Sequence, residues 1–306
     1  MATAWTENVL YNCLGLRPGE RVLALVDEPL RQAGEALCAT VGRLGRCVVL
    51  PRPGALSVVP TRLMREAAAA DVVVALVSAL DLGQEPAGLR SARAALRPEA
   101  RWALGAFITP DVLEHELAAD CHAVAEATAA VARRLNGVEQ VHISTAAGTD
   151  LTFRLGGRPI WQDTGLLTAP GARGNLPAGE AFVAPLEESA EGRLVVDGSL
   201  GDIPLDGPVT LTFRRGQVVD VAGGSAAAEL ERRLQAEPGA RSIAEFGVGT
   251  NPHARLRGRA MLDEKVQGTV HVAIGGNRSF GGTNDAAAHY DCVILSPHVM
   301  LDGQPL

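Results

Sequence analysis

The chain has 306 residues, of which 47% are hydrophobic and 21% are charged, and its net charge at neutral pH is −7. This composition is typical of globular proteins, and the length suits two domains better than one core. The acidic balance argues against a nucleic-acid partner, and no apolar run is long enough to cross a membrane.

The N-terminal sequence, MATAWTENVLYNC, has no basic start followed by an apolar core, so no secretion signal is predicted. The five cysteines are scattered without a C-x-x-C pair, which is typical of reduced thiols and favours a cytoplasmic location. Of the 28 basic residues only Lys265 is a lysine. This is either chance or a position that needs a compact ammonium group rather than a guanidinium.

The first part of the chain alternates between apolar strand patterns and helical patterns. Strands are predicted at residues 21–28, 46–52, 71–78 and 100–107. Helices are predicted at 29–45, 60–70 and 86–96, followed by one long helix over 109–137. This alternation indicates an α/β domain with a parallel sheet covered on both faces. No glycine-rich phosphate-binding motif follows any of these strands, so nucleotide binding has little support.

The pattern changes near residue 138, where strand and hairpin signals replace the alternation. Only one further helix is predicted, over residues 225–237. We therefore expect an α/β domain at 1–137 and a mainly β (α+β), glycine-rich domain at 138–306, which should hold the metal-binding and catalytic residues.

A histidine and an aspartate stand two residues apart in the stretch DAAAHYDCVIL. If this is a strand, His289 and Asp291 point to one face and Tyr290 and Cys292 to the other. An imidazole and a carboxylate on one face form half of a metal site or of an acid–base pair. The alternative is a strand end whose polar residues face water.

Three other residues of the second domain add to this pair. Glu180, Glu245 and His271 lie in apolar or glycine-rich stretches, and with His289 and Asp291 they form an oxygen and nitrogen ligand set for zinc, cobalt, manganese or ferrous iron. Each also has a simpler explanation: a turn cap for Glu180, a pair with Arg241 or Arg255 for Glu245, and a satisfied core histidine for His271.

Several motifs in this region occur together in a fixed order. The runs GTDLTF, NLPAGEAFVAP, AEFGVGTNP, LDEKVQGTVHVAIGG and HYD resemble the aminopeptidase T and aminopeptidase S family of metallo-aminopeptidases. The resemblance covers about residues 138–295. It implies an α/β domain followed by a largely β domain with a paired metal site, and a homodimer with an enclosed active-site cavity.

The resemblance also implies roles for individual residues. Glu180, Glu245, His271, His289 and Asp291 match the metal ligands, with Glu245 as the glutamate that bridges the two divalent ions (zinc, cobalt or manganese). The family's tyrosine, seven residues after the histidine of H-x-A-x-G, is replaced by Arg278.

Three residues are therefore predicted to be catalytic. Glu264 is expected to act as a general base, and Lys265 or Arg278 to stabilise an oxyanion. Glu264 could instead pair with Lys265 or Arg259, and Arg278 could be a solvated loop arginine. The expected substrate is a small peptide or another small molecule.

Two other functions stay open. The 2,5-dihydroxypyridine dioxygenases look like relatives of these peptidases, and the resemblance then implies one ferrous ion held by His271, His289 and Asp291. The other hypothesis is that the chain is a non-catalytic relative that binds a small molecule. Only the missing tyrosine supports it. Carboxylates clustered without a metal would repel one another, which argues against it.

Overall fold

The computed structural model describes residues 4–50, 61–80 and 87–306. The chain forms two compact units, Met1–Ala125 with Thr164–Ala178, and Glu126–Asp163 with Gly179–Leu306. The sequence placed the boundary after Gly137, whereas this division falls inside helix α6 (Cys121–Leu135) and returns Thr164–Ala178 to the first unit. Among the described residues, no helix combines the length and the apolar character needed to cross a bilayer.

A five-stranded parallel sheet forms the centre of the first unit, in the order β2-β1-β3-β4-β8. Its strands are β1 (Val22–Asp27), β2 (Gly45–Leu50), β3 (Val72–Leu76), β4 (Arg101–Gly105) and β8 (Arg173–Asn175). The first four lie where apolar runs predicted them, although residues 51 and 52 of the second run are outside the described residues. Both β1 and β3 are buried along their whole length, as expected for strands covered on both faces. The predicted α/β domain is confirmed.

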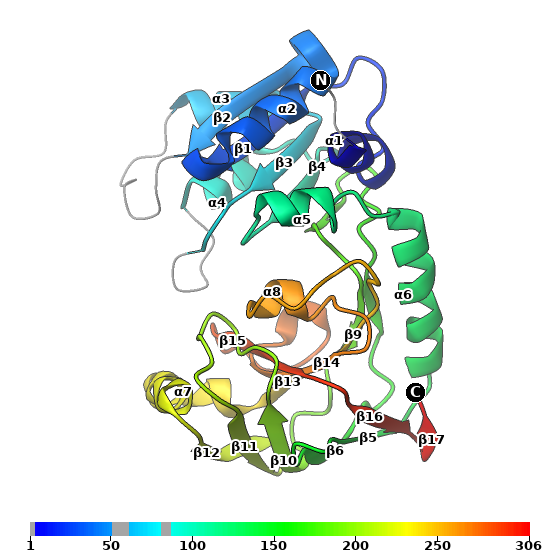
Figure 1. Ribbon diagram of the computed structural model, residues 1–306, viewed down its shortest axis with the longest axis vertical. Helices are drawn as coiled ribbons and strands as arrows, with labels where there is room; N and C mark the ends of the chain where they lie inside the picture. The colour runs from blue at the N-terminus through cyan, green and yellow to red at the C-terminus, as the bar shows by residue number, and fades with distance from the viewer. Residues whose placement is uncertain (1–3, 51–60, 81–86) are drawn as a thin grey trace. The chain divides into compact units, whose positions relative to one another are not determined.

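Helices surround this sheet (Figure 1). They are α1 (Ala4–Glu7), η1 (Asn8–Cys13), η2 (Glu28–Leu30), α2 (Arg31–Val41), η3 (Gly42–Leu44), α3 (Thr61–Ala69), α4 (Ala87–Ala95) and α5 (Pro110–Glu114). The single long helix predicted at 109–137 is wrong, because the chain forms α5 and α6 instead. The carboxylate of Asp120 accepts hydrogen bonds from the backbone N–H groups of His122 and Ala123, at 2.9 and 3.4 Å, and so begins a new helix.

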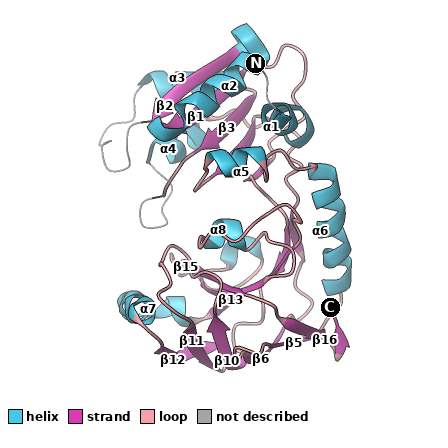
Figure 2. Cartoon of the chain, in the orientation of Figure 1, coloured by secondary structure: helices cyan, strands magenta, loops and turns pink. Residues whose placement is uncertain are grey.

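Two antiparallel sheets form the second unit (Figure 2). The larger, in the order β12-β11-β10-β6-β5-β16-β17, contains β5 (Gln140–Ser144), β6 (Asp150–Arg154), β10 (Glu191–Val196), β11 (Val209–Arg214), β12 (Gln217–Ala222), β16 (His298–Leu301) and β17 (Gln304–Pro305). The smaller, in the order β15-β14-β13-β9-β7, contains β7 (Trp161–Asp163), β9 (Glu180–Val183), β13 (Ile243–Gly249), β14 (Val270–Gly275) and β15 (His289–Ile294). The helices of the second unit are the part of α6 from Glu126 onward, α7 (Ser225–Ala236), as predicted, and the short η4 (Pro238–Arg241), α8 (Ala260–Asp263) and η5 (Arg278–Phe280).

The core of this unit includes buried residues from both sheets. Val183, Val272 and Ile294 of the smaller sheet belong to the same buried cluster as residues of the larger one. The rings of Phe153 on β6 and Phe246 on β13 meet with centroids 5.3 Å apart. Because strand residues alternate between faces, one face of the smaller sheet is used for this core and the other face is available for the site.

Candidate metal centre

All five predicted metal ligands lie on the face of the smaller sheet opposite the core. Residues paired across antiparallel strands point to the same face. Each ligand is paired with a small residue: Glu180 with Gly249, His271 with Gly247, His289 with Gly275, and both Glu245 and Asp291 with Ala273. The alternation predicted for the stretch HYDC is observed, since Cys292 belongs to the core cluster. The small neighbours leave room for the long acidic and imidazole side chains.

Gly247 shows this requirement most directly. A Cβ atom at this position would lie 2.1 Å from two ring atoms of His271, a distance that side chains do not tolerate. The glycine therefore lets the imidazole lie flat over β13. His271 is completely buried there, so its ring has a defined position.

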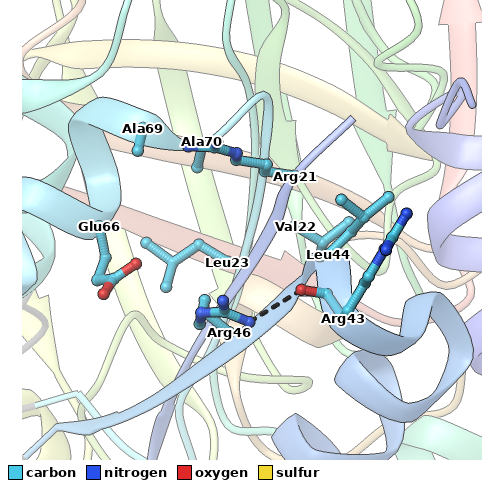
Figure 3. A pocket seen from close by; sticks show the side chains of 9 residues that line it. All are labelled: Arg21, Val22, Leu23, Arg43, Leu44, Arg46, Glu66, Ala69 and Ala70. Atoms are coloured by element: carbon cyan, nitrogen blue, oxygen red, sulfur yellow. Dashed lines mark hydrogen bonds between the residues drawn. The ribbon is translucent and has the colours of Figure 1, made fainter. Parts of the chain in front are cut away.

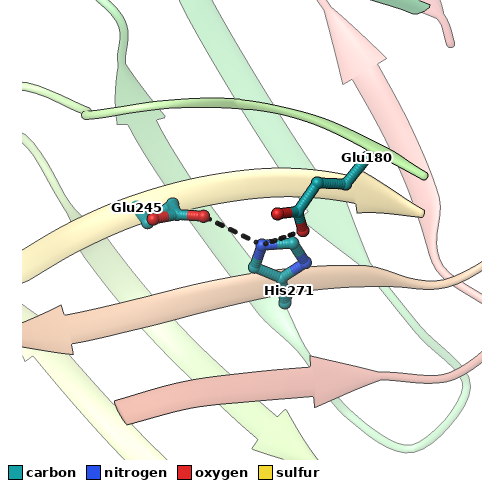
Figure 4. A group of neighbouring side chains, drawn as sticks. All are labelled: Glu180, Glu245 and His271. Atoms are coloured by element: carbon teal, nitrogen blue, oxygen red, sulfur yellow. Dashed lines mark hydrogen bonds and ion pairs between the residues drawn. The ribbon is translucent and has the colours of Figure 1, made fainter. Parts of the chain in front are cut away.

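Glu245 connects the two histidines. Its Oε1 atom lies 3.1 Å from Nε2 of His271, and its Oε2 atom lies 3.5 Å from Nε2 of His289. Glu180 approaches His271 from the other side, with its Oε2 atom 3.5 Å from the same Nε2 atom (Figure 4). One carboxylate thus presents a separate oxygen to each of two imidazoles.

His289 is oriented by contacts at both ring nitrogens. Its Nδ1 atom lies 2.8 Å from the carbonyl oxygen of Gly276, and its Nε2 atom lies 3.2 Å from Oδ1 of Asp291. Donation from Nδ1 to a backbone carbonyl leaves Nε2 as the atom that faces the carboxylates, and this arrangement is common for histidines that bind metals.

Lys265 is surrounded by carboxylates of the same cluster. Its side chain is buried, and Nζ lies 2.6 Å from Glu180, 3.0 Å from Glu264 and 3.1 Å from Asp163. Burial alone would lower the pKa of Lys265, but the three carboxylates hold it well above the ordinary value. The lysine is therefore charged, which supports the idea that this position needs an ammonium group. Asp163 was missed, because nothing in the sequence around it marks it as part of a site.

Burial also changes the protonation of the carboxylates. It raises the pKa of Glu180 and, more strongly, that of Glu264, and the attraction of Lys265 opposes both shifts. Burial would raise the pKa of Asp291 as well, but the nearby His289 outweighs it and holds the value below the ordinary one. Asp291 is therefore the carboxylate most firmly ionised among these three.

The pKa values of the two histidines are raised as well, but here the neighbouring carboxylates cause the shift and burial opposes it. Burial would lower the pKa of His271, but the hydrogen bond with Glu245 and the charge of Glu180 raise it to about 9. In the same way Asp291 and Glu245 outweigh burial at His289 and raise its pKa to about 10. Without a cation between them, these carboxylates draw protons onto the histidines. The surroundings thus favour positive charge at this face of the sheet.

The donor atoms fit a divalent metal. Three sets of side chains bring their ligand atoms within 4.8 Å of one another: Glu180, Glu245 and His271; Glu245, His289 and Asp291; Glu264, His271 and Asp291. In the described part of the chain, Oε2 of Glu180 and Nδ1 of His271 are buried without a hydrogen-bond partner. Buried polar atoms are rarely left without a hydrogen bond, so a ligand for Oε2 of Glu180 is expected. Oxygen and nitrogen donors of this kind suit zinc, manganese, cobalt or ferrous iron.

Arg278 does not join this cluster. Its side chain is 62% exposed, forms an ion pair with Asp285 and donates a hydrogen bond to the carbonyl oxygen of Thr283 at 3.1 Å. It lines a pocket of the 276–288 loop, and His289 lines the same pocket. Its predicted role at an oxyanion stays a prediction. The alternative pairing of Glu245 with Arg241 is not observed, since Arg241 pairs with Glu231.

A separate cavity of about 280 Å³ lies within the first unit (Figure 3). It is lined by Arg21, Arg43, Arg46 and Glu66, and Arg46 donates a hydrogen bond to the carbonyl oxygen of Arg43 at 3.0 Å. None of the predicted site residues lines it. It lies near the first residues of β1 and β2, whereas α/β sheets usually bind ligands at the carboxyl ends of their strands.

The fold and the site together place the chain in a class of proteins with an α/β unit, a two-sheet unit and a carboxylate–histidine cluster on one sheet face. The profile of the family described as "NicX: 2,5-dihydroxypyridine 5,6-dioxygenase" matches residues 60–306, and the chain belongs to this family. The predicted resemblance to both dioxygenases and aminopeptidases is confirmed.

Individual relatives are enzymes of both kinds. The chain is 28% identical to 2,5-dihydroxypyridine 5,6-dioxygenase of Pseudomonas putida over 185 residues, which are 55% of this chain and 52% of the relative. It is 31% identical to aminopeptidase T of Thermus thermophilus over 179 residues, 51% of this chain and 43% of the relative. These alignments span about half the length of the curated relatives.

Solved structures of the same two kinds share the fold. The P. putida dioxygenase superimposes with a TM-score of 0.75 and 22% identity, covering 100% of this chain and 96% of the other. The T. thermophilus aminopeptidase superimposes with a TM-score of 0.71 and 20% identity, covering 99% and 98%. At these identities the likeness shows the fold alone, and it agrees with the predicted two-part architecture.

Proposed function

We propose that the chain is a metal-dependent hydrolase that holds two divalent ions and cleaves the N-terminal residue from a small peptide or cleaves a small amide. The observation that carries this proposal is the position of Glu245, whose two oxygens face His271 and His289 separately. A carboxylate shared between two ligand sets is what a pair of ions requires. Glu180 and His271 would complete one set, and His289 and Asp291 the other.

The charges of the site support a pair of ions. Five carboxylates lie in the cluster, and Lys265 offsets one of them. With neutral histidines and all five carboxylates ionised, four negative charges are left, which two divalent cations balance. A single divalent cation would leave two negative charges in a buried place, where unpaired charge is costly.

The residues around the ions have distinct roles in this proposal. When bound, the ions would supply a water of lowered pKa and polarise the carbonyl group of the substrate. Glu264 is buried, has a raised pKa and lies beside His271 and Asp291, so it is suited to hold and return a proton. Lys265 is fully engaged by Glu180, Glu264 and Asp163, so it acts as a positioning residue.

Two measurements test the proposal: the metal content of the protein and its hydrolysis of a model substrate. Elemental mass spectrometry of anaerobically purified protein is expected to give two zinc, cobalt or manganese ions per chain. The same sample should hydrolyse aminoacyl 4-nitroanilides. Glu245→Gln should lose metal and activity together. One metal ion per chain with no hydrolysis, or full activity in this variant, would contradict the paired site.

A second candidate is a single-iron dioxygenase acting on a hydroxylated aromatic ring. Family membership supports it, and so does the ring of Phe280, which meets His289 edge-on at 5.9 Å and Phe182 at 5.6 Å. His271, His289 and Asp291 would hold the iron. One iron per chain, with oxygen uptake on 2,5-dihydroxypyridine, would favour this candidate over the hydrolase. The expected homodimer and cytoplasmic location stay predictions from the sequence.

A further inference from the structure

The loop between β14 and β15, residues 276–288, forms a pocket beside the metal centre. The pocket has a volume of about 450 Å³, and Arg278, Phe280, Asp285 and His289 are among the residues that line it. Cavities of roughly 300–1,000 Å³ are the usual size for small-molecule sites. Because His289 belongs both to the pocket wall and to the metal-binding face, a molecule in the pocket would lie next to the reacting centre.

The loop is held firmly, so the pocket exists before any ligand binds. Asn277 is completely buried, and its amide donates to Oε1 of Glu187 at 3.1 Å and accepts from the backbone N–H of Asn284 at 2.9 Å. Glu187 also accepts from the backbone N–H of Thr283 at 2.7 Å and pairs with Arg158 at 2.6 Å. A site that is already formed loses little conformational entropy on binding.

Gly282 permits this arrangement. A Cβ atom there would lie 2.0 Å from the side chain of Asn277, so only glycine lets the buried amide reach its partners. The loop conformation therefore depends on this glycine as well as on the contacts of Glu187.

The wall of the pocket offers one aromatic surface and one cationic group. Phe280 provides the aromatic surface and lies between Phe182 and His289. Arg278 provides the guanidinium, which pairs with Asp285 while both side chains are more than 60% exposed. Exposed ion pairs contribute little to stability, so this one can open at small cost when another carboxylate arrives. Arginine is well suited to receive it, since its fork binds a carboxylate through two hydrogen bonds.

We propose that this pocket binds a substrate with a carboxylate on a planar, aromatic body, with the carboxylate paired to Arg278 and the ring against Phe280. Arg278 then determines specificity, in place of the oxyanion role predicted from the sequence. The inference rests on the proposed function, because it assigns a substrate class to that site. The proposed recognition depends on charge, so a neutral molecule of the same shape should bind more weakly.

Benzoate and benzamide are suitable probes, since they have the same ring and nearly the same shape but only benzoate is charged. Binding to the metal-loaded full chain would be measured by isothermal titration calorimetry. Benzoate is expected to bind at least about tenfold more tightly than benzamide, and added salt should reduce the difference.

Variants separate Arg278 from the metal as the source of this preference. Arg278→Ala should abolish the preference, whereas benzoate bound directly to metal would keep it. Arg278→Lys should keep part of the preference, and Arg232→Ala, which breaks the ion pair of an exposed arginine with Glu229 on α7, should keep all of it. Asp285→Asn should tighten benzoate binding by up to about fivefold, because the competing carboxylate is gone.

The inference is overturned if benzoate fails to bind saturably, binds no better than benzamide, or keeps its preference in Arg278→Ala. The metal content of the same samples distinguishes this failure from failure of the proposed function. Two ions per chain without an Arg278-dependent preference would remove the inference and leave the hydrolase. An Arg278-dependent preference with fewer than two ions would keep the inference and remove the paired-metal site.

Discussion

The two faces of the smaller sheet in the second unit are made by the same strands but have opposite chemistry. On β13, Phe246 contacts Phe153 in the core, while its neighbour Glu245 faces the two histidines. On β14, Val272 is in the core and His271 is in the site. Adjacent residues of one strand therefore serve separate purposes. Packing on one face holds the strands in register, and the register then aligns the ligands on the other face.

The largest effect is expected from Glu245→Gln, which changes the site face and leaves the core face untouched. The amide has nearly the same size but cannot supply an anionic oxygen to each histidine. We expect kcat to fall by at least about 1,000-fold, as when a group that organises the reaction is removed. The metal content should fall in the same preparation, while the circular dichroism spectrum should be unchanged. Turnover close to that of the wild type would refute the shared-carboxylate arrangement.

Phe246→Ala is the matched change on the core face. It removes a completely buried ring, and such truncations cost about 3–5 kcal/mol. Urea unfolding monitored by circular dichroism should show this loss in the free energy of unfolding. At temperatures where the variant is folded, its metal content should match that of the wild type. If Phe246→Ala instead lost metal while keeping its stability, the two faces would not be separable in the way the comparison requires.

Lys265→Met tests the charge balance of the site face. The change leaves Glu180, Glu264 and Asp163 without their shared partner, and removing one side of a buried ion pair costs about 3–5 kcal/mol. Part of this cost is offset because burial already raises the pKa of Glu180 and Glu264, which lets them take up protons. We expect a loss of about 3 kcal/mol at pH 8 and a smaller loss at pH 6, measured by urea unfolding. A loss independent of pH would indicate that packing, not charge, is what the lysine provides.

Much of this architecture could be predicted from the sequence, because the strands differ in their hydrophobic patterns. The apolar runs of β1 and β3 mark a parallel sheet, and the alternation in HYDC separates site residues from core residues. The five predicted ligands were identified from motifs, and the structure brings their side chains to one face of the smaller sheet.

Other features depend on contacts that a local pattern cannot contain. Asp163 reaches Lys265 only after β7 has paired with β9, so its own surroundings in the sequence give no signal. Strand β8, with the sequence RGN, has no strand pattern and is defined by its pairing with β4. The break between α5 and α6 was hidden because the apolar spacing continues across Asp120, whose capping role needs the folded geometry.

The smallest effect of a substitution is expected at Glu187, which anchors the 276–288 loop beside the site face. Burial would raise the pKa of Glu187, but Arg158 and the backbone N–H of Thr283 outweigh it and lower the value to about 2. A pKa below that of the unfolded chain means that the ionised form stabilises the fold above about pH 4.5. This contribution is lost as the pH falls from about 4.5 toward 2.

Glu187→Gln removes that contribution, so at pH 7 the variant should be less stable by about 1.5–3 kcal/mol, the scale of hydrogen bonds to a charged group. At pH 3 the difference between the two proteins should shrink, because the wild-type carboxylate is then losing its advantage. Taking the difference cancels the titration of the other acids, which both proteins share. The core face is unchanged, so the loss should be accompanied by faster hydrogen exchange in residues 276–288 and not in β13. A difference in stability that stays constant from pH 7 to pH 3 would mean that Glu187 acts through shape alone, and the loop would then not depend on charge.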